Sequence, residues 1–318
     1  MTKESSPRIQ DSFRRGIWAA VPTPCDSDGG IDFSGVESNA RYFAETLNLE
    51  GVFCNGLMGE GWSMTLSERK TVLEATIAGA GTALRVGVVT THHSFTDTVA
   101  LSQHAAQAGA DHIVLFRPAG HFSSEELHDY VLAVSALVDI PIILFDSAAQ
   151  SGGYPMRVVR RLGKAGLISG VKCTRDADSV VRLRANCGDA VTVLDPYESH
   201  WFSNLIRFDF RVLYADPEPY LFQTADCQLI RDYLAAYEEG SIEEAARICR
   251  RLEPLRRTYE RWITGPLERG GPMNAALKHW CARLGMAAGP VRAPLRPLTT
   301  EQIKSLDREL DEAFNAVL

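Results

Sequence analysis

A lysine closes one of the apolar stretches of the chain. Lys172 ends the run 167–172, Leu-Ile-Ser-Gly-Val-Lys, which has the composition of a buried strand. Lysine is rarely fully buried unless it is paired or has a chemical task. Burial disfavours the ammonium form, and a free amine can add to a carbonyl carbon to form a Schiff base. Alternatively, the side chain extends past the strand end into water, so Lys172 alone does not decide between chemistry and packing.

Other polar residues follow apolar runs at positions where they could assist such an amine. His92 and His93 could transfer protons, or they could be ordinary polar residues at the rim of a site. Asp146 is the other candidate base, although an aspartate there could equally cap the following loop. Asp195 ends a later run, and we expect it to contact the substrate.

A glycine-rich turn begins at Gly56. With Gly59 and Gly61, it allows a tight turn whose backbone amides could face an anion such as a carboxylate. An ordinary strand-to-helix turn is the alternative. Leu57 and Met58 add no side-chain hydrogen bond, so the backbone would have to hold any anion bound here.

Histidines and acids near these runs could also form a metal site. However, His92, His93 and His121 show no HxH or HxxxH spacing that would support one. We therefore expect no metal and no other cofactor.

The apolar runs are spaced like the strands of a parallel sheet with helices between them. Each run is short, rich in Val, Ile, Leu or Phe, and bounded by turn residues, as is typical of strands covered on both faces. Helix-capping patterns such as that of Ser123 with Glu126 separate the runs. The expected strands are residues 17–21, 51–55, 84–89, 112–116, 141–146, 167–172, 191–195 and 210–215.

Eight strands, each followed by a helix, predict an α/β fold of the (β/α)8 TIM barrel type. A doubly wound open sheet is the alternative, but no GxGxxG turn follows the first strand. In such barrels the site lies at the carboxyl ends of the strands, where the candidate residues fall. Only helical patterns follow the eighth strand, at 221–237, 242–258, 272–284 and 300–314. We expect an N-terminal extension at 1–15, the barrel at 16–238 and a C-terminal helical region at 239–318.

Composition narrows the partners of the chain. Its 318 residues have a net charge of −7 and no basic tract, which argues against nucleic acid and anionic membranes as partners. No apolar stretch approaches the ~20 residues that span a bilayer, and the polar N-terminus lacks a signal core, so we expect a cytoplasmic protein. Seven cysteines without a CxxC pair argue against a disulfide framework and a structural zinc site.

The order and spacing of several motifs resemble those of the dihydrodipicolinate synthase / N-acetylneuraminate lyase family of Schiff-base aldolases. The resemblance covers nearly the whole chain. Its motifs are the opening 16–24 with DGGID at 28–32, GLMGE at 56–60, TLSER at 65–69, GAD at 109–111, IPIILF at 140–145, GVK at 170–172 and the segment 285–298.

The resemblance implies a (β/α)8 barrel with a C-terminal helical region, commonly a homotetramer. It also implies a lysine on the sixth strand that forms a Schiff base with an α-keto acid, usually pyruvate or a compound that releases it. Lys172 occupies that position, which favours chemistry over packing. We therefore expect a carbon–carbon or carbon–oxygen lyase of the Schiff-base aldolase type, acting on a small carbonyl compound as a tetramer or dimer.

Several residues depart from the family pattern. Phe145 stands in place of the strand-five tyrosine that shuttles the proton. Leu57 and Met58 replace the two hydroxyl residues that hold the keto-acid carboxylate. The tyrosine lent by a neighbouring subunit is missing at 117–119, and Gln150 stands where the synthase has an arginine.

These departures predict a diverged Schiff-base lyase that lacks the usual tyrosine relay. The apolar replacements predict a substrate that is less polar at one end than pyruvate. Two alternatives stay open: a dihydrodipicolinate synthase-type condensation of pyruvate with an aldehyde, and a non-catalytic barrel that binds a metabolite.

Overall fold

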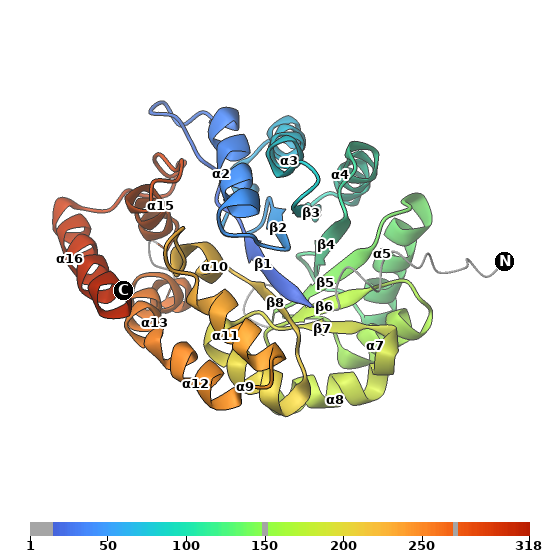
Figure 1. Cartoon of the computed structure of the whole chain (residues 1–318). Coiled ribbons are helices and arrows are strands. Elements are labelled where there is room, and N and C mark those ends of the chain that lie inside the picture. The colour runs from blue at the N-terminus through green and yellow to red at the C-terminus, as the bar shows by residue number, and fades with distance from the viewer. Residues whose placement is uncertain (1–14, 148–151, 270–272) are drawn as a thin grey trace.

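Eight parallel strands form the centre of the molecule (Figure 1). The computed structural model describes residues 15–147, 152–269 and 273–318; most of the predicted N-terminal extension, and Gln150, lie outside these ranges. The strands are β1 (Gly16–Ala20), β2 (Gly51–Cys54), β3 (Arg85–Val89), β4 (His112–Phe116), β5 (Ile142–Asp146), β6 (Gly170–Cys173), β7 (Thr192–Leu194) and β8 (Val212–Ala215).

The sheet closes into a barrel. Neighbouring strands pair in the order β7-β6-β5-β4-β3-β2-β1-β8. At the remaining seam, the Asp195 amide donates to the Val212 carbonyl at 3.1 Å and the Tyr214 amide donates to the Asp195 carbonyl at 2.7 Å. The predicted (β/α)8 TIM barrel is therefore confirmed.

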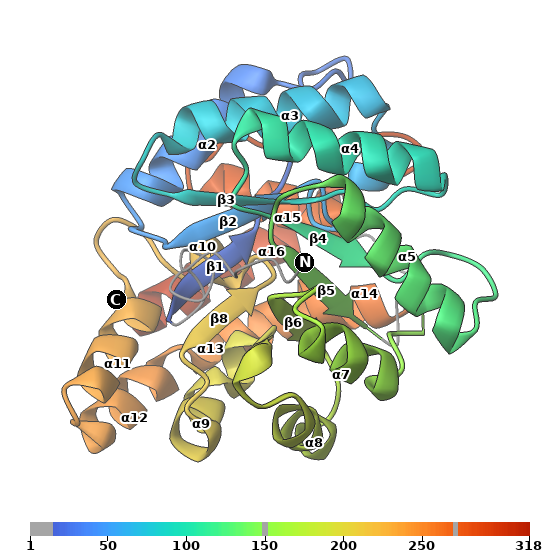
Figure 2. The same ribbon diagram turned by 90° about the vertical axis from the view of Figure 1, so that its right-hand side faces the viewer.

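Helices cover the outside of the barrel, and Figure 2 shows α2, α3 and α4 side by side over the first strands. Thr65 and Ser123 start two of the helices with capping boxes, as the sequence pattern indicates. The α-helices between the strands, together with the first two after β8, are α2 (Phe33–Glu45), α3 (Leu66–Ala80), α4 (Phe95–Ala108), α5 (Ser124–Leu137), α7 (Met156–Lys164), α8 (Ala177–Cys187), α9 (Glu198–Phe208), α10 (Glu218–Leu221) and α11 (Leu229–Glu238).

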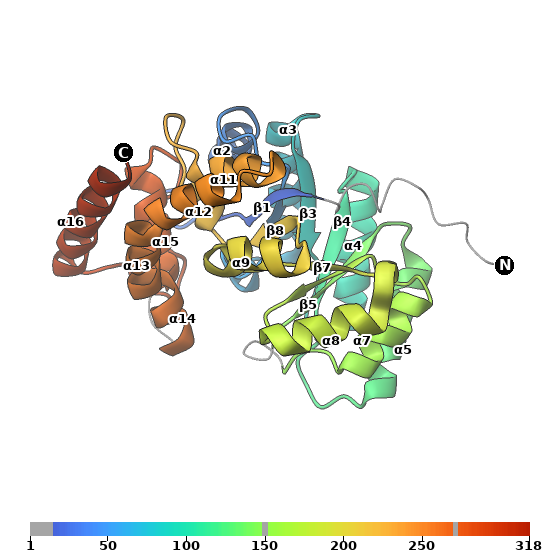
Figure 3. The same cartoon turned by 60° about the horizontal axis from the view of Figure 1, so that its bottom comes forward.

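The C-terminal helices gather on one side of the barrel (Figure 3). They are α12 (Ile242–Arg251), α13 (Glu253–Tyr259), the π-helical segment Glu260–Thr264, α14 (Gly265–Arg269), α15 (Met273–Arg283) and α16 (Thr300–Val317). They fall within the region predicted at 239–318, although the domain boundary itself stays a prediction.

Two of the predicted C-terminal helices were too long. The segment predicted at 221–237 contains a turn, in which Thr224 and Cys227 exchange backbone hydrogen bonds, and α11 begins only at Leu229. The segment predicted at 242–258 divides at Leu252, because Pro254 has no amide to continue the hydrogen-bond ladder and instead sits in the first turn of α13.

Aromatic rings fill part of the barrel interior. Trp18 packs edge-on against His112 at 5.2 Å between ring centroids, and Tyr214 stacks on Phe53 at 4.4 Å. His112 Nε2 and the Tyr214 hydroxyl lie 2.6 Å apart. Burial lowers the pKa of His112 to about 3, so the imidazole is neutral in the folded protein at neutral pH. Packed side chains therefore fill this part of the barrel interior.

Candidate active site

Lys172 points into the barrel. Alternate residues of a strand face opposite sides, so Lys172 faces inward while Val171 and Cys173 face the helices. Lys172 lies in register with Phe145 on one neighbouring strand and Leu194 on the other. Its side chain is 2% exposed, so it does not extend past the strand end into water.

A narrow cavity surrounds the amine. Nζ lies 5.0 Å from the centre of the Phe53 ring and 4.9 Å from that of Phe145, within the range of cation–π attraction. The free volume is about 10 Å³, about the space that one water molecule needs, so a larger ligand must displace lining side chains. The lining residues are Ala20, Phe53, Leu57, Met58, Val114, Phe116, Phe145, Lys172 and Asp216.

Asp216 is the one acidic residue in this lining. It directly follows β8, and its Oδ1 lies 2.5 Å from Lys172 Nζ. The Asp216 side chain is 22% exposed, against 2% for the lysine. The carboxylate therefore connects a buried amine to the open end of the barrel. The sequence alone did not single out Asp216, because several strands end in an acid.

A second carboxyl group and a tyrosine lie close enough to Asp216 for their pKa values to respond to it. Glu218, at the start of α10, is 4% exposed; burial raises its pKa well above the usual range, and the Asp216 charge raises it further. Burial also raises the pKa of Tyr197 to about 12, again with a contribution from Asp216, while a hydrogen bond with Thr174 opposes the shift. Glu218 and Tyr197 therefore both favour their protonated, neutral forms.

The predicted glycine turn forms one wall of the cavity. The side chains of Leu57 and Met58 line it, and Gly56 and Gly59 form the backbone of the turn. Two of the turn's amides are used internally, since Glu60 donates to the Leu57 carbonyl at 3.2 Å and Gly61 to the Gly56 carbonyl at 3.1 Å. Gly59 is packed tightly, since an added Cβ would lie 3.0 Å from the Val21 carbonyl oxygen.

The C-terminal region holds this turn in place. Glu60 has a left-handed backbone, with φ of 54°, and its buried carboxylate pairs with Lys278 of α15 at 2.9 Å. The same carboxylate accepts the Arg292 amide at 3.0 Å. Asn274 donates its side-chain amide to the Leu57 carbonyl at 3.1 Å. The helices after the barrel therefore help to shape the cavity wall.

Asp146, a predicted base, lies outside the cavity. It directly follows the inward-facing Phe145, so it points toward the helices and is 1% exposed. Its carboxylate forms a bidentate ion pair with Arg175 and accepts the Tyr154 amide at 2.7 Å. This arrangement ties together the ends of β5 and β6, and it leaves Asp146 without access to the lysine.

The other three predicted polar residues are not in the cavity lining either. His92 accepts the Ser94 amide at 3.1 Å through Nδ1, which also lies 3.2 Å from Asp97. His93 is exposed beside it. Asp195 faces outward and accepts the side-chain amide of Asn204 at 2.6 Å, and burial raises its pKa to about 6. The structure thus joins Lys172, Phe145, Leu57 and Met58, and separates them from the four predicted polar residues Asp146, His92, His93 and Asp195.

No metal cluster accompanies these residues in the part of the chain that the structure describes: no group of three His, Cys, Asp or Glu side chains is placed to hold an ion. In the same residues, no helix has both the length and the apolar character needed to cross a bilayer.

Comparison with known proteins assigns the chain to a family. The model of the "Dihydrodipicolinate synthetase family" matches residues 13–313. The chain belongs to this family. It is accordingly an enzyme, a lyase of the Schiff-base aldolase type.

Its relatives within the dihydrodipicolinate synthetase family are distant. A 4-hydroxy-tetrahydrodipicolinate synthase of Methanothrix thermoacetophila is 28% identical over 294 residues, which cover 90% of this chain and 92% of that protein. An N-acetylneuraminate lyase of Rhizobium meliloti is 27% identical over 297 residues, covering 92% of each chain. Among solved structures, a sialic acid aldolase of Ruminococcus gnavus described as a catalytic lysine mutant superposes with a TM-score of 0.82 at 20% identity, covering 97% of this chain and 99% of that one.

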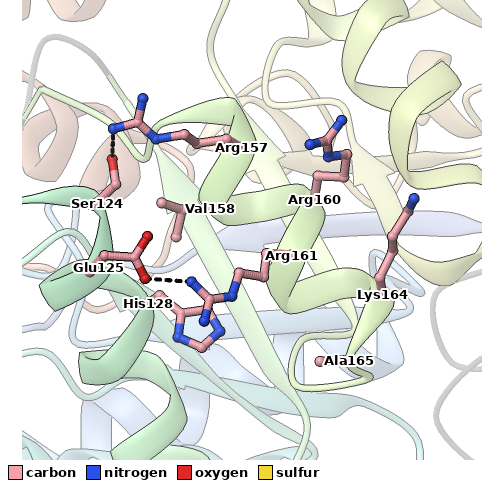
Figure 4. Close-up of a pocket in the computed structure, with 9 residues that line it drawn as sticks. All are labelled: Ser124, Glu125, His128, Arg157, Val158, Arg160, Arg161, Lys164 and Ala165. Atoms are coloured by element: carbon pink, nitrogen blue, oxygen red, sulfur yellow. Dashed lines mark hydrogen bonds and ion pairs between the residues drawn. The ribbon is translucent and has the colours of Figure 1, made fainter.

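A wider hollow lies outside the barrel of this family member, between α5 and α7, with a volume of about 640 Å³ (Figure 4). Arg161 pairs with Glu125 at 2.5 Å across it, and Arg157 donates to the Ser124 hydroxyl at 2.6 Å. Its lysine, Lys164, is exposed. A hydrated amine on the outer helices lacks the desolvation that favours a nucleophile, so the cavity around Lys172 is the candidate active site.

Proposed function

We propose that the protein is a Schiff-base lyase in which Lys172 adds to the carbonyl carbon of a small α-keto acid or related carbonyl compound. The observation that carries this proposal is the position of the amine. Nζ is buried in a cavity at the carboxyl ends of the strands of a closed barrel, and it has a carboxylate at 2.5 Å. The resulting imine would accept electrons from an adjacent bond and so promote its cleavage or formation.

The known relatives support this assignment. One relative is a synthase and another a lyase, so the family includes both bond formation and bond cleavage. The fold neighbour described as a catalytic lysine mutant supports a lysine as the group that reacts. Lys172 is the inward-facing lysine of the candidate site and would have that role here.

The site also supports a proton transfer that differs from the tyrosine relay. Phe145 lies in register with Lys172, and its ring centre is 4.9 Å from Nζ. A phenyl ring has no proton to transfer, so another group has to serve. Apart from the lysine and Asp216, the described lining is apolar, which suits a carbonyl compound that is less polar than pyruvate at the end facing Leu57 and Phe53.

Condensation of pyruvate with an aldehyde is a second candidate, favoured by the 28% identity to a synthase over nearly the whole chain. It predicts turnover of pyruvate itself. We further propose a cytoplasmic homo-oligomer, a tetramer or a dimer. Large exposed apolar side chains such as Leu137 at 51% and Ile206 at 50% are consistent with subunit contacts. Light scattering of the purified protein tests the assembly.

Trapping of the Schiff base tests the main proposal. The protein is incubated with pyruvate or with 2-oxo acids that have apolar or aromatic side chains, reduced with borohydride, and digested for peptide mass analysis. We expect a mass increase on Lys172 that is greater with at least one of the apolar 2-oxo acids than with pyruvate.

Lys278 provides an internal control for this experiment, because it too is 2% exposed and paired with a carboxylate, but does not line the cavity. It should stay unmodified, and a Lys172→Met variant should lose the adduct. Adducts confined to exposed lysines would contradict the proposal.

A further inference from the structure

The contact between Lys172 and Asp216 raises the question of what the carboxylate does. A buried ammonium ion gains stability from a carboxylate partner, so the pair could be purely structural. However, the pair faces the cavity rather than the packed interior, and both members line the space where a ligand has to sit. Any carbonyl carbon that reaches Nζ therefore also comes close to Asp216.

Schiff-base formation requires proton transfers that the other described lining residues cannot perform. The side chains of Phe53, Phe116, Phe145 and Val114 have no exchangeable proton. The predicted bases Asp146, His92 and His93 are held outside the cavity. Asp216 is the one acidic residue among the described lining residues, and it already lies at hydrogen-bond distance from the reacting nitrogen.

We propose that Asp216 is the catalytic acid–base residue of this site: it takes protons from Lys172 Nζ and gives them to the substrate oxygen. The inference rests on the proposed function, which it deepens by assigning the role that Phe145 cannot perform.

The proton balance of the step is complete with these groups alone. Asp216 first accepts one proton from the ammonium group, which leaves a neutral amine. The nitrogen lone pair forms the C–N bond, the carbonyl π pair moves to oxygen, and Asp216 returns its proton to that oxygen. Asp216 then takes a second proton from nitrogen and gives it to the hydroxyl, which leaves as water when the C–O bond breaks. The products are a protonated imine, one water and the original carboxylate.

The surroundings of Asp216 suit this cycle. The carboxylate is 22% exposed, so it can meet both the buried amine and a ligand oxygen. Its neighbour Glu218 is buried, and burial raises its pKa, so Glu218 favours its protonated form. The Asp216 carboxylate would also stabilise the positive charge of the imine that replaces the ammonium ion.

Reductive methylation of lysines measures this role without requiring the natural substrate. Formaldehyde forms an imine with any accessible amine, and cyanoborohydride reduces that imine, so peptide mass analysis gives a rate for each lysine. We compare the wild type with Asp216→Asn, Asp216→Glu and, as a matched control, Asp111→Asn. Asp111 lies at the amino end of β4, where it accepts the Val86 amide at 2.7 Å.

General acid–base catalysis typically contributes about 10²- to 10⁴-fold. We therefore expect Asp216→Asn to slow methylation of Lys172 by about 10²-fold or more at neutral pH, and its rate to rise steeply with pH as solvent takes over deprotonation. Asp216→Glu should restore part of the rate. Lys172 in Asp111→Asn should react at the wild-type rate. In every variant, the exposed Lys164 and Lys304 should also react at their wild-type rates.

The opposite result has a distinct meaning. If Asp216 only stabilises the ammonium ion, its removal frees the amine, and Lys172 in Asp216→Asn would react as fast as in the wild type or faster; this overturns the inference. If methylation depends on Asp216 but no 2-oxo acid is trapped, the inference stands and the proposed function fails. If Lys172 of the folded wild type is not methylated at all, the inference fails, and trapping with the 2-oxo acids decides the proposed function separately.

Discussion

Replacing Asp146 with asparagine separates a structural role from a catalytic one. The carboxylate is 1% exposed and accepts three N–H groups, namely two of Arg175 and the Tyr154 amide. An asparagine keeps one acceptor oxygen, and its NH₂ group would face one of these donors. The change therefore removes the bidentate ion pair and leaves Arg175 without its charged partner, although Arg175 still donates to the Tyr154 carbonyl.

The expected cost follows from this geometry. Removing one member of a buried ion pair costs about 3–5 kcal/mol. Because the Arg175 side chain is 28% exposed, water compensates part of the lost contact, and we expect a loss near 3 kcal/mol in the free energy of unfolding. Asp195→Asn is the matched control, since Asp195 is also buried at a strand end but accepts from two neutral donors, the Tyr197 amide and the Asn204 side-chain amide; its loss should be smaller.

Urea unfolding followed by tryptophan fluorescence measures the stability, and borohydride trapping of the folded variant measures the chemistry. We expect Asp146→Asn to be destabilised yet to form the adduct on Lys172 in conditions where it is folded. An Asp146→Asn variant of unchanged stability that forms no adduct would refute this reasoning and return Asp146 to the role of base.

Three further predictions concern the barrel interior. Gly87→Ala should destabilise the protein by about 1–3 kcal/mol, because the new Cβ would lie 2.1 Å from Nε2 of the buried His112; Gly56→Ala, whose Cβ would meet its nearest neighbour at 3.5 Å, should cost clearly less in urea unfolding, and equal losses would contradict the packing. The pKa of His112 is about 3 in the fold and about 6.5 when unfolded, so the unfolded chain binds the proton first as the pH falls. The folded state therefore loses stability as the pH falls from 6.5 to 3, and at pH 5 this loss is about 2 kcal/mol. His112→Gln should lose correspondingly less stability between pH 7 and pH 5 than the wild type. An equal loss in the two proteins would rule out His112 as its source. Phe145→Tyr places a hydroxyl near Lys172 and should raise the rate of pyruvate trapping several-fold, whereas an unchanged rate would show that a tyrosine at this position adds nothing to the proton transfer.

The barrel could be predicted because each strand is a short apolar run and because helix caps mark the segments between the runs. The sequence could not predict whether the acids at the strand ends face into the barrel or toward the helices. Asp146, Asp195 and Asp216 all lie at the end of a predicted strand, and the sequence offers no difference between them. The alternation of side chains along each strand decides which way these acids point. Asp146 and Asp195 directly follow inward-facing residues, so they point outward. Asp216 lies two residues after the inward-facing Tyr214, so it points inward.

Lys172 could be singled out because a charged residue closes an apolar run, and the resemblance then gave it a chemical role. Its partner could not be found in the same way, because Asp216 lies 44 residues away along the chain and only closure of the barrel brings the two together. The effect of the C-terminal region on the cavity was equally hidden. Lys278 and Asn274 belong to a helix after the barrel, and their contacts with the turn at 56–60 appear only in the fold.

The central claim is that the Lys172 amine forms a covalent imine inside the barrel, and a crystal structure of the borohydride-reduced adduct tests it most directly. We predict continuous density from Nζ to the former carbonyl carbon, lying between the rings of Phe53 and Phe145 with Asp216 at hydrogen-bond distance. An unmodified Lys172 in protein that mass analysis shows to be labelled, or a ligand bound away from this cavity, would contradict the account.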